Sequence, residues 1–328
     1  MFLDLHLKSG AAGDFCGEFR RPSPLDIGRH LRYQAGVPLP AETTGRHPLH
    51  GSPWRRTIAL LWHRIAVAPW DRIDARNKGQ SHVGDLTSRQ AAIVTVITTC
   101  LMLITLRFVV MDSDVQEHLA NGLESLVHQF APKLYVATLR AHSLWVHLAW
   151  ITGCITVYLL IPAVVLHALF GLKLREIYLM PCDYFKKLPI YALLFLPVGL
   201  TVVAAASQPD FQLQYPFYTG LHLWDQLTWE LAYAAQFFAL EFFFRGFILR
   251  GLSAEMGASA VLAMAMPYCM LHYGKPLPEC LGSIAAGTVL GILAMDTKSI
   301  WGGVTIHVAV AWSMDAAALV QKSGRPHF

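Results

Sequence analysis

The chain has 328 residues, of which 54% are hydrophobic and 15% are charged, and its formal net charge is +4 at pH 7. Soluble domains carry about 25% charged residues, so this composition excludes an ordinary soluble protein and favours a membrane protein. We expect no nucleic-acid partner, although the modest net charge says little about it. The six scattered cysteines form no CxxC pair of the kind found in zinc or redox motifs.

Residues 1–90 differ from the rest of the chain. They hold 13 of the 26 Lys and Arg residues and seven prolines, and they contain no apolar run of span length. We expect this basic segment to be mostly disordered and cytoplasmic. Within it, residues 54–68 place apolar side chains at i, i+3, i+4 and i+7 beside several arginines, which predicts a helix in the headgroup layer. A short soluble helix is the alternative.

After residue 90 the apolar residues come in blocks of roughly 17–25, the length of a membrane span. The blocks are 91–111, 146–170, 188–206, 227–249, 256–272, 280–295 and 299–320. Helices are the expected spanning elements because lipid offers no partner to backbone polar groups, and no block alternates like a barrel strand. The sequence therefore predicts an all-α polytopic transmembrane bundle of about seven or eight spans, with N-terminal transmembrane helices at 91–171, a second helical domain at 172–320 and a tail at 321–328.

The distribution of Lys and Arg predicts the orientation of the bundle. Their excess before residue 90 places the N-terminus in the cytoplasm. The loop 172–187, with four Lys or Arg residues, falls on the same side, and the loop 207–225, with two aspartates and no Lys or Arg, falls outside. Seven spans leave Lys322 and Arg325 outside, against the rule, so the count is open by one. We expect an integral protein of the inner or plasma membrane.

Ionisable groups within spans are informative because each costs roughly 2.5–3.5 kcal/mol at the centre of a span. In the last four spans they are Glu230, Glu241, Arg245, His272, His307 and Asp315, and Arg107 and His167 lie in earlier spans. Glu241 and Arg245 are at i and i+4, a spacing that suits a helical ion pair, so a purely structural role is one interpretation. His272 follows a helix-kinking proline, and His307 lies about two turns into the last span. Each alone could be a core histidine.

A ladder of small residues lies between the two histidines. Ser283, Gly287 and Gly291 recur every four residues, and such ladders let neighbouring helices pack closely. We expect the ladder to draw the flanking helices together. A carboxylate and two imidazoles in one buried pocket could then activate water for attack on a peptide carbonyl. A zinc site formed by Glu241 and the two histidines is the alternative.

Three motifs in order resemble the CAAX-prenyl endopeptidase and bacteriocin-processing (CPBP, or Abi) family of intramembrane proteases. The segment LEFFFRG at 240–246 is similar to the family's EExxxR followed by glycine. Tyr268 and His272 match its F/YxxxH motif, and His307 and Ala311 stand at the ends of its HxxxN or HxxxD motif. Each motif is weak by itself, and the ordered set is more specific.

The resemblance covers roughly residues 172–320 and implies a catalytic transmembrane domain. It implies hydrolysis of a peptide bond in a membrane-associated substrate, which is lipidated or a peptide precursor. In this interpretation Glu241 is the general base assisted by His272, His307 stabilises the oxyanion and Arg245 orients Glu241. The glutamate chemistry needs no cofactor, and zinc bound by Glu241, His272 and His307 is the variant.

Two departures from the family motifs bear on activity. Leu240 stands where the family has the glutamate that activates water. If Glu241 is fully occupied by its ion pair with Arg245, the chain has no general base and is inactive. If the helix is rotated by about 100°, the angle of one residue, Glu241 points towards His272 and can act as the base. Ala311 stands where an asparagine or aspartate would help to hold the oxyanion.

The two departures from the motifs raise the questions of which other residues assist the site and whether the protein has another function. Asp315, two turns after His307, could partly replace the side chain missing at position 311, and Tyr268 belongs to the second motif. An inactive family member that binds a peptide or lipid, as an immunity or scaffold protein, is an alternative to the enzyme. A proton or small-molecule transporter is a further alternative, although the chain has no inverted repeat.

Overall fold

The structure is a computed structural model, and the residues that it describes are 70, 74, 81–133, 135, 141–173, 176–181, 184–220 and 222–323. All of them belong to one compact unit, Trp62–Phe328. The predicted headgroup-layer helix at 54–68 lies outside the described residues, as do most of segment 1–90 and the end of the tail. What the sequence predicts for those parts stays a prediction.

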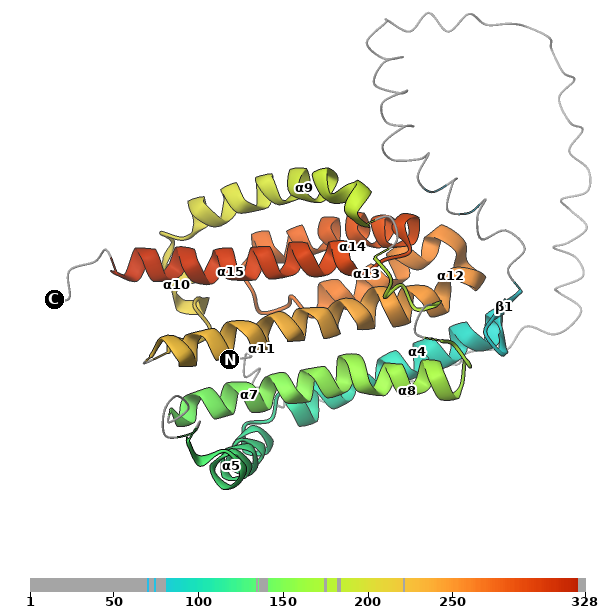
Figure 1. Cartoon of the computed structure of the whole chain (residues 1–328). Helices are drawn as coiled ribbons and strands as arrows, with labels where there is room; N and C mark the ends of the chain where they lie inside the picture. Colours follow the sequence, from blue (N-terminus) through green and yellow to red (C-terminus); the bar gives the residue numbers. More distant parts are fainter. Residues whose placement is uncertain are drawn as a thin grey trace, which may run out of the picture. The chain divides into compact units, whose positions relative to one another are not determined.

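Nearly all of the described chain is helical (Figure 1). A short antiparallel hairpin of β1 (His82–Val83) and β2 (Leu86–Thr87) comes first. The next helices are α4 (Ser88–Thr105), η2 (Leu106–Val110), α5 (Ser113–Phe130), α7 (His142–Ile155), η3 (Thr156–Leu160), α8 (Ile161–Ala168), α9 (Tyr184–Ala205) and α10 (Pro209–Gln214). The last are α11 (Leu223–Glu241), η5 (Phe242–Leu249), α12 (Arg250–Met256), η6 (Gly257–Ser259), α13 (Ala260–Met270), α14 (Leu277–Thr297) and α15 (Trp301–Ser323). The segments η2, η3 and η5 are π-helical and continue the helix before them, whereas η6 is a 3-10 turn.

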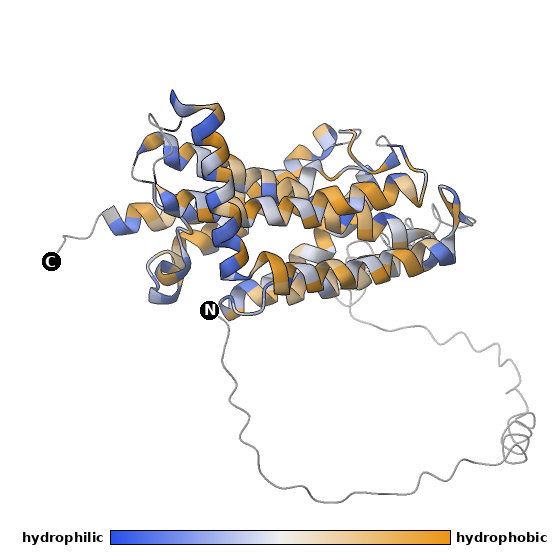
Figure 2. Ribbon diagram, turned by 90° about the horizontal axis from the view of Figure 1, so that it is seen from below, coloured by the Kyte–Doolittle hydropathy of each residue, from blue (hydrophilic) through white to orange (hydrophobic). Residues whose placement is uncertain are grey.

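Six helical stretches of the described residues are long and apolar enough to cross a membrane. They are Ser88–Val110, His142–Ala168, Tyr184–Ala205, Leu223–Met270, Leu277–Thr297 and Trp301–Lys322. Hydrophobic residues cover most of the length of these helices, and hydrophilic residues gather near their ends and in the connections (Figure 2). The predicted all-α polytopic bundle is confirmed. The count differs from the predicted seven because Leu223–Met270 contains the 227–249 block and most of the 256–272 block.

The stretch 223–270 is not one straight helix. Gly257 has φ +56°, a conformation that glycine adopts without steric cost, and the chain reverses there. As a result α13 runs back beside η5, and the ring of Tyr268 lies 5.2 Å from the ring of Phe244. Helix α13 has 11 residues and is therefore about 16 Å long, about half of the hydrocarbon thickness.

Hydrogen bonds between connecting segments define two ends of the bundle (Figure 1). At one end, Arg250 Nε donates to the carbonyl of Glu176, at 3.3 Å, and joins α12 to the segment between α8 and α9. This end also carries Lys173, Lys187 and Lys298, and we call it the basic end. At the opposite end, the Tyr215 hydroxyl donates to a carboxylate oxygen of Glu279, at 3.1 Å, and joins the α10–α11 connection to α14.

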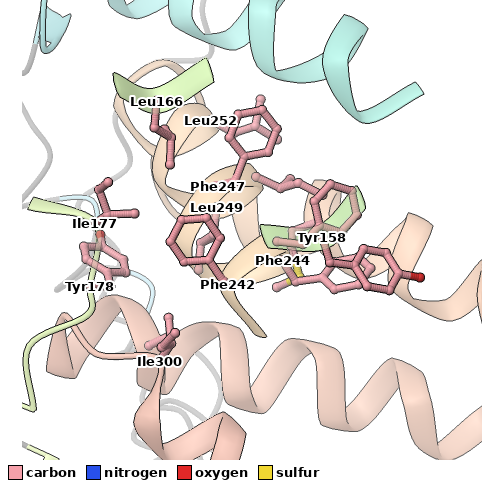
Figure 3. Close-up of a cluster of buried hydrophobic side chains, with 14 of the residues drawn as sticks. Tyr158, Leu166, Ile177, Tyr178, Phe242, Phe244, Phe247, Leu249, Leu252 and Ile300 are labelled. Atoms are coloured by element: carbon pink, nitrogen blue, oxygen red, sulfur yellow. The ribbon is translucent and has the colours of Figure 1, made fainter. Parts of the chain in front are cut away.

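The main apolar cluster surrounds the π-helical segment η5, and all eight residues of η5 are buried. Around Phe242 and Phe247 lie Tyr158, Leu166 and Ile177 from other parts of the chain (Figure 3). Since lipid tails are as apolar as these side chains, their burial stabilises the bundle mainly through dispersion and close packing. The packing fixes the helix that carries Glu241 at its junction with η5.

The predicted small-residue ladder lies where α14 packs against α13. A Cβ atom at Gly287 would lie 2.9 Å from Cδ1 of Tyr268, and one at Gly291 would lie 2.8 Å from Cε of Met264. Both distances are shorter than a methyl group tolerates. The glycines therefore let α13 approach α14, and this contact holds Tyr268 in place.

Candidate active site

Glu241 and Arg245 form an ion pair at the junction of α11 and η5. Both side chains have 0% exposure, and Arg245 Nη1 donates to Glu241 Oε1 at 2.8 Å. Removing one partner of a buried pair costs about 3–5 kcal/mol, so each charge depends on the other. Glu241 Oε2 and the Nε and Nη2 atoms of Arg245 have no hydrogen-bond partner among the described residues.

Helix α15 brings His307 to the same carboxylate. Its Nδ1 lies 2.6 Å from Glu241 Oε1, an ion-pair distance, although the angle is not that of a hydrogen bond. The imidazole stacks on Phe237, with ring centroids 5.6 Å apart and an interplanar angle of 7°. The His307 side chain is 15% exposed, whereas Glu241 is fully buried. His307 is therefore the part of this contact that reaches the surface of the bundle.

Tyr268 joins the site through its hydroxyl. Tyr268 Oη lies 2.7 Å from His307 Nε2, and the guanidinium carbon of Arg245 lies 5.0 Å from the centroid of the tyrosine ring. The side chain of Tyr268 is 2% exposed. A carboxylate, an imidazole and a phenol from three helices thus follow one another in direct contact.

His272 lies beside this chain of contacts and not within it. Its Nδ1–H donates to the carbonyl of Tyr268, at 2.9 Å, and the two rings are 4.9 Å apart. This bond leaves Nε2 as an acceptor, and burial lowers the pKa of His272 to about 4. The ring is therefore neutral at neutral pH. No hydrogen bond or ion pair joins His272 to Glu241 among the described residues. The predicted turn of Glu241 towards His272 is not seen, because the carboxylate faces Arg245 and His307.

Asp315 lies in a second polar region further along α15. It is 1% exposed and within electrostatic range of Glu230 on α11. Eight residues of helix separate it from His307 by about 12 Å, and no hydrogen bond or ion pair joins the two in the described chain. No contact therefore supports the prediction that Asp315 replaces the side chain missing at position 311.

The two departures from the family motifs sit in apolar surroundings. Leu240 is half-buried and packs against the main apolar cluster. Ala311 is 5% exposed and belongs to a second cluster that contains Trp229 and Tyr233. Neither side chain provides a polar atom to the site. Among the described residues of the site, Glu241 is thus the one carboxylate that contacts a histidine of the motifs.

The zinc variant does not fit this arrangement. Glu241 Oε1 is held by the cationic Arg245, and the two ring nitrogens of His307 face Glu241 and Tyr268. In the part of the chain that the structure describes, no three His, Cys, Asp or Glu residues are placed to hold a metal ion.

Two glycines at the start of α15 complete the site and were not among the predicted site residues. A methyl group at Gly303 would overlap Oε2 of Glu241, and one at Gly302 would overlap the ring of Tyr191 on α9. The two consecutive glycines could have indicated this contact. Glycine is unfavourable within a helix, so a pair of glycines there indicates that other groups approach the backbone closely. Phe237 could not be predicted from the sequence either, since its contact with His307 depends on the packing of α11 on α15.

The fold and the site define a class of protein before any comparison. A fully buried carboxylate and guanidinium that meet an imidazole from another apolar helix are suited to hydrolysis within a membrane. Residues 223–313 match the family model of the Rce1-like proteins, described as type II CAAX prenyl endopeptidase Rce1-like. The match includes all three motifs, and it confirms the resemblance inferred from them. No curated protein and no solved structure matches the chain significantly. Over residues 223–313 this integral membrane protein is similar to CAAX-type intramembrane proteases.

Proposed function

We propose that the protein is an intramembrane endopeptidase that hydrolyses a peptide bond of a membrane-associated substrate. The substrate is a lipidated protein or a peptide precursor, as the family relationship suggests. The observation that carries the proposal is the contact between Glu241 of α11 and His307 of α15, in which the facing atoms are 2.6 Å apart. A buried carboxylate beside an imidazole is an arrangement that takes up the proton of an attacking water molecule.

The proposed base is the Glu241–His307 pair. This assignment differs from the roles expected from the resemblance, in which His272 assists Glu241, because the carboxylate contacts His307. The negative charge of Glu241 stabilises the imidazolium that forms when the pair takes the water proton, as in other carboxylate–imidazole pairs. The loss of a glutamate at position 240 is then compatible with catalysis.

Arg245 has two proposed tasks. Its Nη1 fixes Oε1 of Glu241 and favours the ionised carboxylate. Its Nε and Nη2 atoms are N–H donors without a protein partner among the described residues, and they would hydrogen-bond to the oxyanion of the tetrahedral intermediate. Pre-organised donors of this kind contribute about 3–4 kcal/mol to transition-state stabilisation.

The remaining steps use His272 and the Glu241–His307 pair. His272 is neutral and presents Nε2 as an acceptor, so it would orient the water by accepting one of its hydrogens. The water oxygen bonds to the carbonyl carbon, and the C–N bond breaks when the intermediate collapses. The proton held by the Glu241–His307 pair then passes to the departing amine and the pair is regenerated.

The proposed orientation puts the basic end of the bundle in the cytoplasm, in agreement with the positive-inside rule. His307 lies six residues into α15, which starts at that end, and is therefore about 9 Å from it. The reaction would take place near the cytoplasmic edge of the membrane, which suits a lipid-anchored substrate.

The test is hydrolysis by purified protein in proteoliposomes that contain a prenylated peptide or a single-span precursor peptide, with products identified by mass spectrometry. Glu241→Gln and His307→Gln should each lower the rate by at least about 10²-fold, the usual share of acid–base catalysis. His118→Gln on α5 is the matched control, because that histidine is exposed and its Nδ1 bonds to the carbonyl of Asp114 in the same helix. Full activity of either site variant would refute the assignment.

An inactive, peptide-binding protein is the second candidate, and the apolar surroundings of Leu240 and Ala311 favour it. Such a protein would hold a peptide or lipid in the same site without cutting it. Cross-linking of the peptide to wild-type protein, with recovery of only the intact peptide, would support this function over hydrolysis. Recovery of cleaved peptide would exclude it.

A further inference from the structure

The hydroxyl of Tyr268 covers the ring nitrogen through which His307 would exchange a proton. Tyr268 Oη is 2.7 Å from His307 Nε2, and Nδ1 of the same ring faces Glu241. Both nitrogens of His307 are therefore engaged by side chains. A water molecule cannot contact Nε2 directly while the phenol is there.

The contacts indicate which atoms carry the hydrogens. A neutral imidazole has one N–H group, and the carboxylate of Glu241 accepts hydrogens only, so the proton of His307 belongs on Nδ1. Nε2 is then an acceptor, and the Tyr268 hydroxyl donates to it. The lone pairs of the phenol oxygen point away from His307 and can accept a hydrogen from a water molecule.

Tyr268 is held rigidly in this position. Its ring meets Phe244 edge-on at 5.2 Å, with an interplanar angle of 87°, and Arg245 lies over it. On the α14 side, Gly287 leaves no room for even a methyl group beside Cδ1. A group held by packing from three sides keeps the short hydrogen bond without further ordering when a substrate binds.

The ion pair that lies over the Tyr268 ring and contacts His307 contains polar atoms that need partners. The Nε and Nη2 atoms of Arg245 and Oε2 of Glu241 are buried and have no hydrogen-bond partner among the described residues. Buried polar groups of this kind usually bind ordered water. A water molecule next to Tyr268 is thus in keeping with the polarity of the site.

We propose that Tyr268 is a catalytic residue that relays the proton of the attacking water to His307, an inference that rests on the proposed hydrolytic function. As the water oxygen bonds to the carbonyl carbon, its proton moves to Tyr268 Oη while the phenolic proton moves to His307 Nε2. The products of this step are the tetrahedral oxyanion, a neutral tyrosine and an imidazolium paired with Glu241. On collapse of the intermediate the same path runs in reverse and delivers the proton to the leaving amine.

The first experiment compares Tyr268→Phe with Tyr158→Phe in the proteoliposome cleavage assay. Tyr158 is a matched control because it is 3% exposed and stacks on Phe243 within the apolar cluster. The relay predicts that Tyr268→Phe lowers kcat by about 10²-fold with KM nearly unchanged, and that Tyr158→Phe has wild-type kinetics. Thermal unfolding of both variants shows whether they are folded.

The second readout is the dependence of kcat on the fraction of deuterium oxide. Two protons move together in the relay, so the wild-type plot should be curved and the residual activity of Tyr268→Phe should give a straight line. If Tyr268→Phe does not fold, 3,5-difluorotyrosine at position 268 keeps the shape and the hydroxyl but makes the phenol more acidic. The relay predicts that this replacement shifts the pH profile of kcat, whereas a purely structural hydroxyl predicts an unchanged profile.

The outcomes separate the relay from the proposed function. A Tyr268→Phe protein that cleaves at a rate within threefold of wild type, or that keeps the curved isotope plot, would overturn the relay alone, provided that Glu241→Gln is inactive. An unshifted profile with difluorotyrosine would do the same. Absence of cleavage by the wild-type protein, or full cleavage by Glu241→Gln, would overturn the proposed function and the relay with it.

Discussion

Replacing Gly303 by alanine tests the geometry of the site with a single methyl group. The added Cβ would overlap Oε2 of Glu241. The carboxylate cannot turn away freely, because its other oxygen is 2.8 Å from Arg245 Nη1 and 2.6 Å from His307 Nδ1. Either α15 moves away from α11, or one of these two contacts breaks.

The magnitudes follow from these two responses. Overpacking a buried site costs typically about 1–3 kcal/mol, and breaking the ion pair would cost more. A displacement of about 1 Å between reacting groups lowers the rate by about 10²-fold. We therefore expect Gly303→Ala to lower the free energy of unfolding by at least about 1 kcal/mol and to lower cleavage by about 10²-fold.

The assay is denaturant-induced unfolding in detergent together with cleavage in proteoliposomes. Gly282→Ala on α14 is the matched control, because a Cβ there has no atom within 4 Å. Glycine within a helix is less stable than alanine by roughly 0.5–1 kcal/mol, so the control should be slightly stabilised and fully active. A Gly303→Ala protein that behaves like this control would refute the close contact between α15 and Glu241.

Three further predictions concern the ion pair, the pH dependence and metals. Arg245→Met should lower the free energy of unfolding by about 3–5 kcal/mol. The double variant Arg245→Met with Glu241→Leu should lower it by less than the sum of the two single effects, because no buried charge is then left unpaired. Additive effects in denaturant titrations would contradict this. The pKa of His272 is lowered from 6.5 to about 4 in the folded protein, so the unfolded chain binds a proton at this ring more readily. The free energy of unfolding should therefore fall by up to about 3 kcal/mol as the pH drops from 6.5 to 4. Thermal midpoints at pH 7 and pH 4.5 should differ less in His272→Gln than in wild type, and equal differences would exclude this cause. Cleavage should be unchanged after treatment with 1,10-phenanthroline, because the donor set does not fit zinc, and inhibition that added zinc reverses would show otherwise.

The fold class could be predicted from the sequence because span length and composition are local properties of the chain. The number of spans could not, and the difference lies at Gly257. A positive φ at this one residue turns the following apolar block back against η5. The hydrophobicity of a stretch of residues does not reveal such a reversal of the chain. The same turn brings Tyr268 to the site, so the site also depends on it.

The site was predicted in part. Spacing along one helix was enough to pair Glu241 with Arg245, because residues at i and i+4 lie on one face. The choice between His272 and His307 as the partner of Glu241 depends on how α13 and α15 are rotated about their axes, which motif spacing does not give. For the same reason, spacing could not show that Asp315, one turn after Ala311, makes no contact with His307 and lies within electrostatic range of Glu230.

The most direct test of the central claim is cleavage of a lipidated peptide in water enriched in oxygen-18. If water activated by the Glu241–His307 pair attacks the carbonyl, wild-type protein should place one labelled oxygen in the new C-terminal carboxylate, and Glu241→Gln should form this product at least about 10²-fold more slowly. Labelled product formed by Glu241→Gln at the wild-type rate would contradict the account.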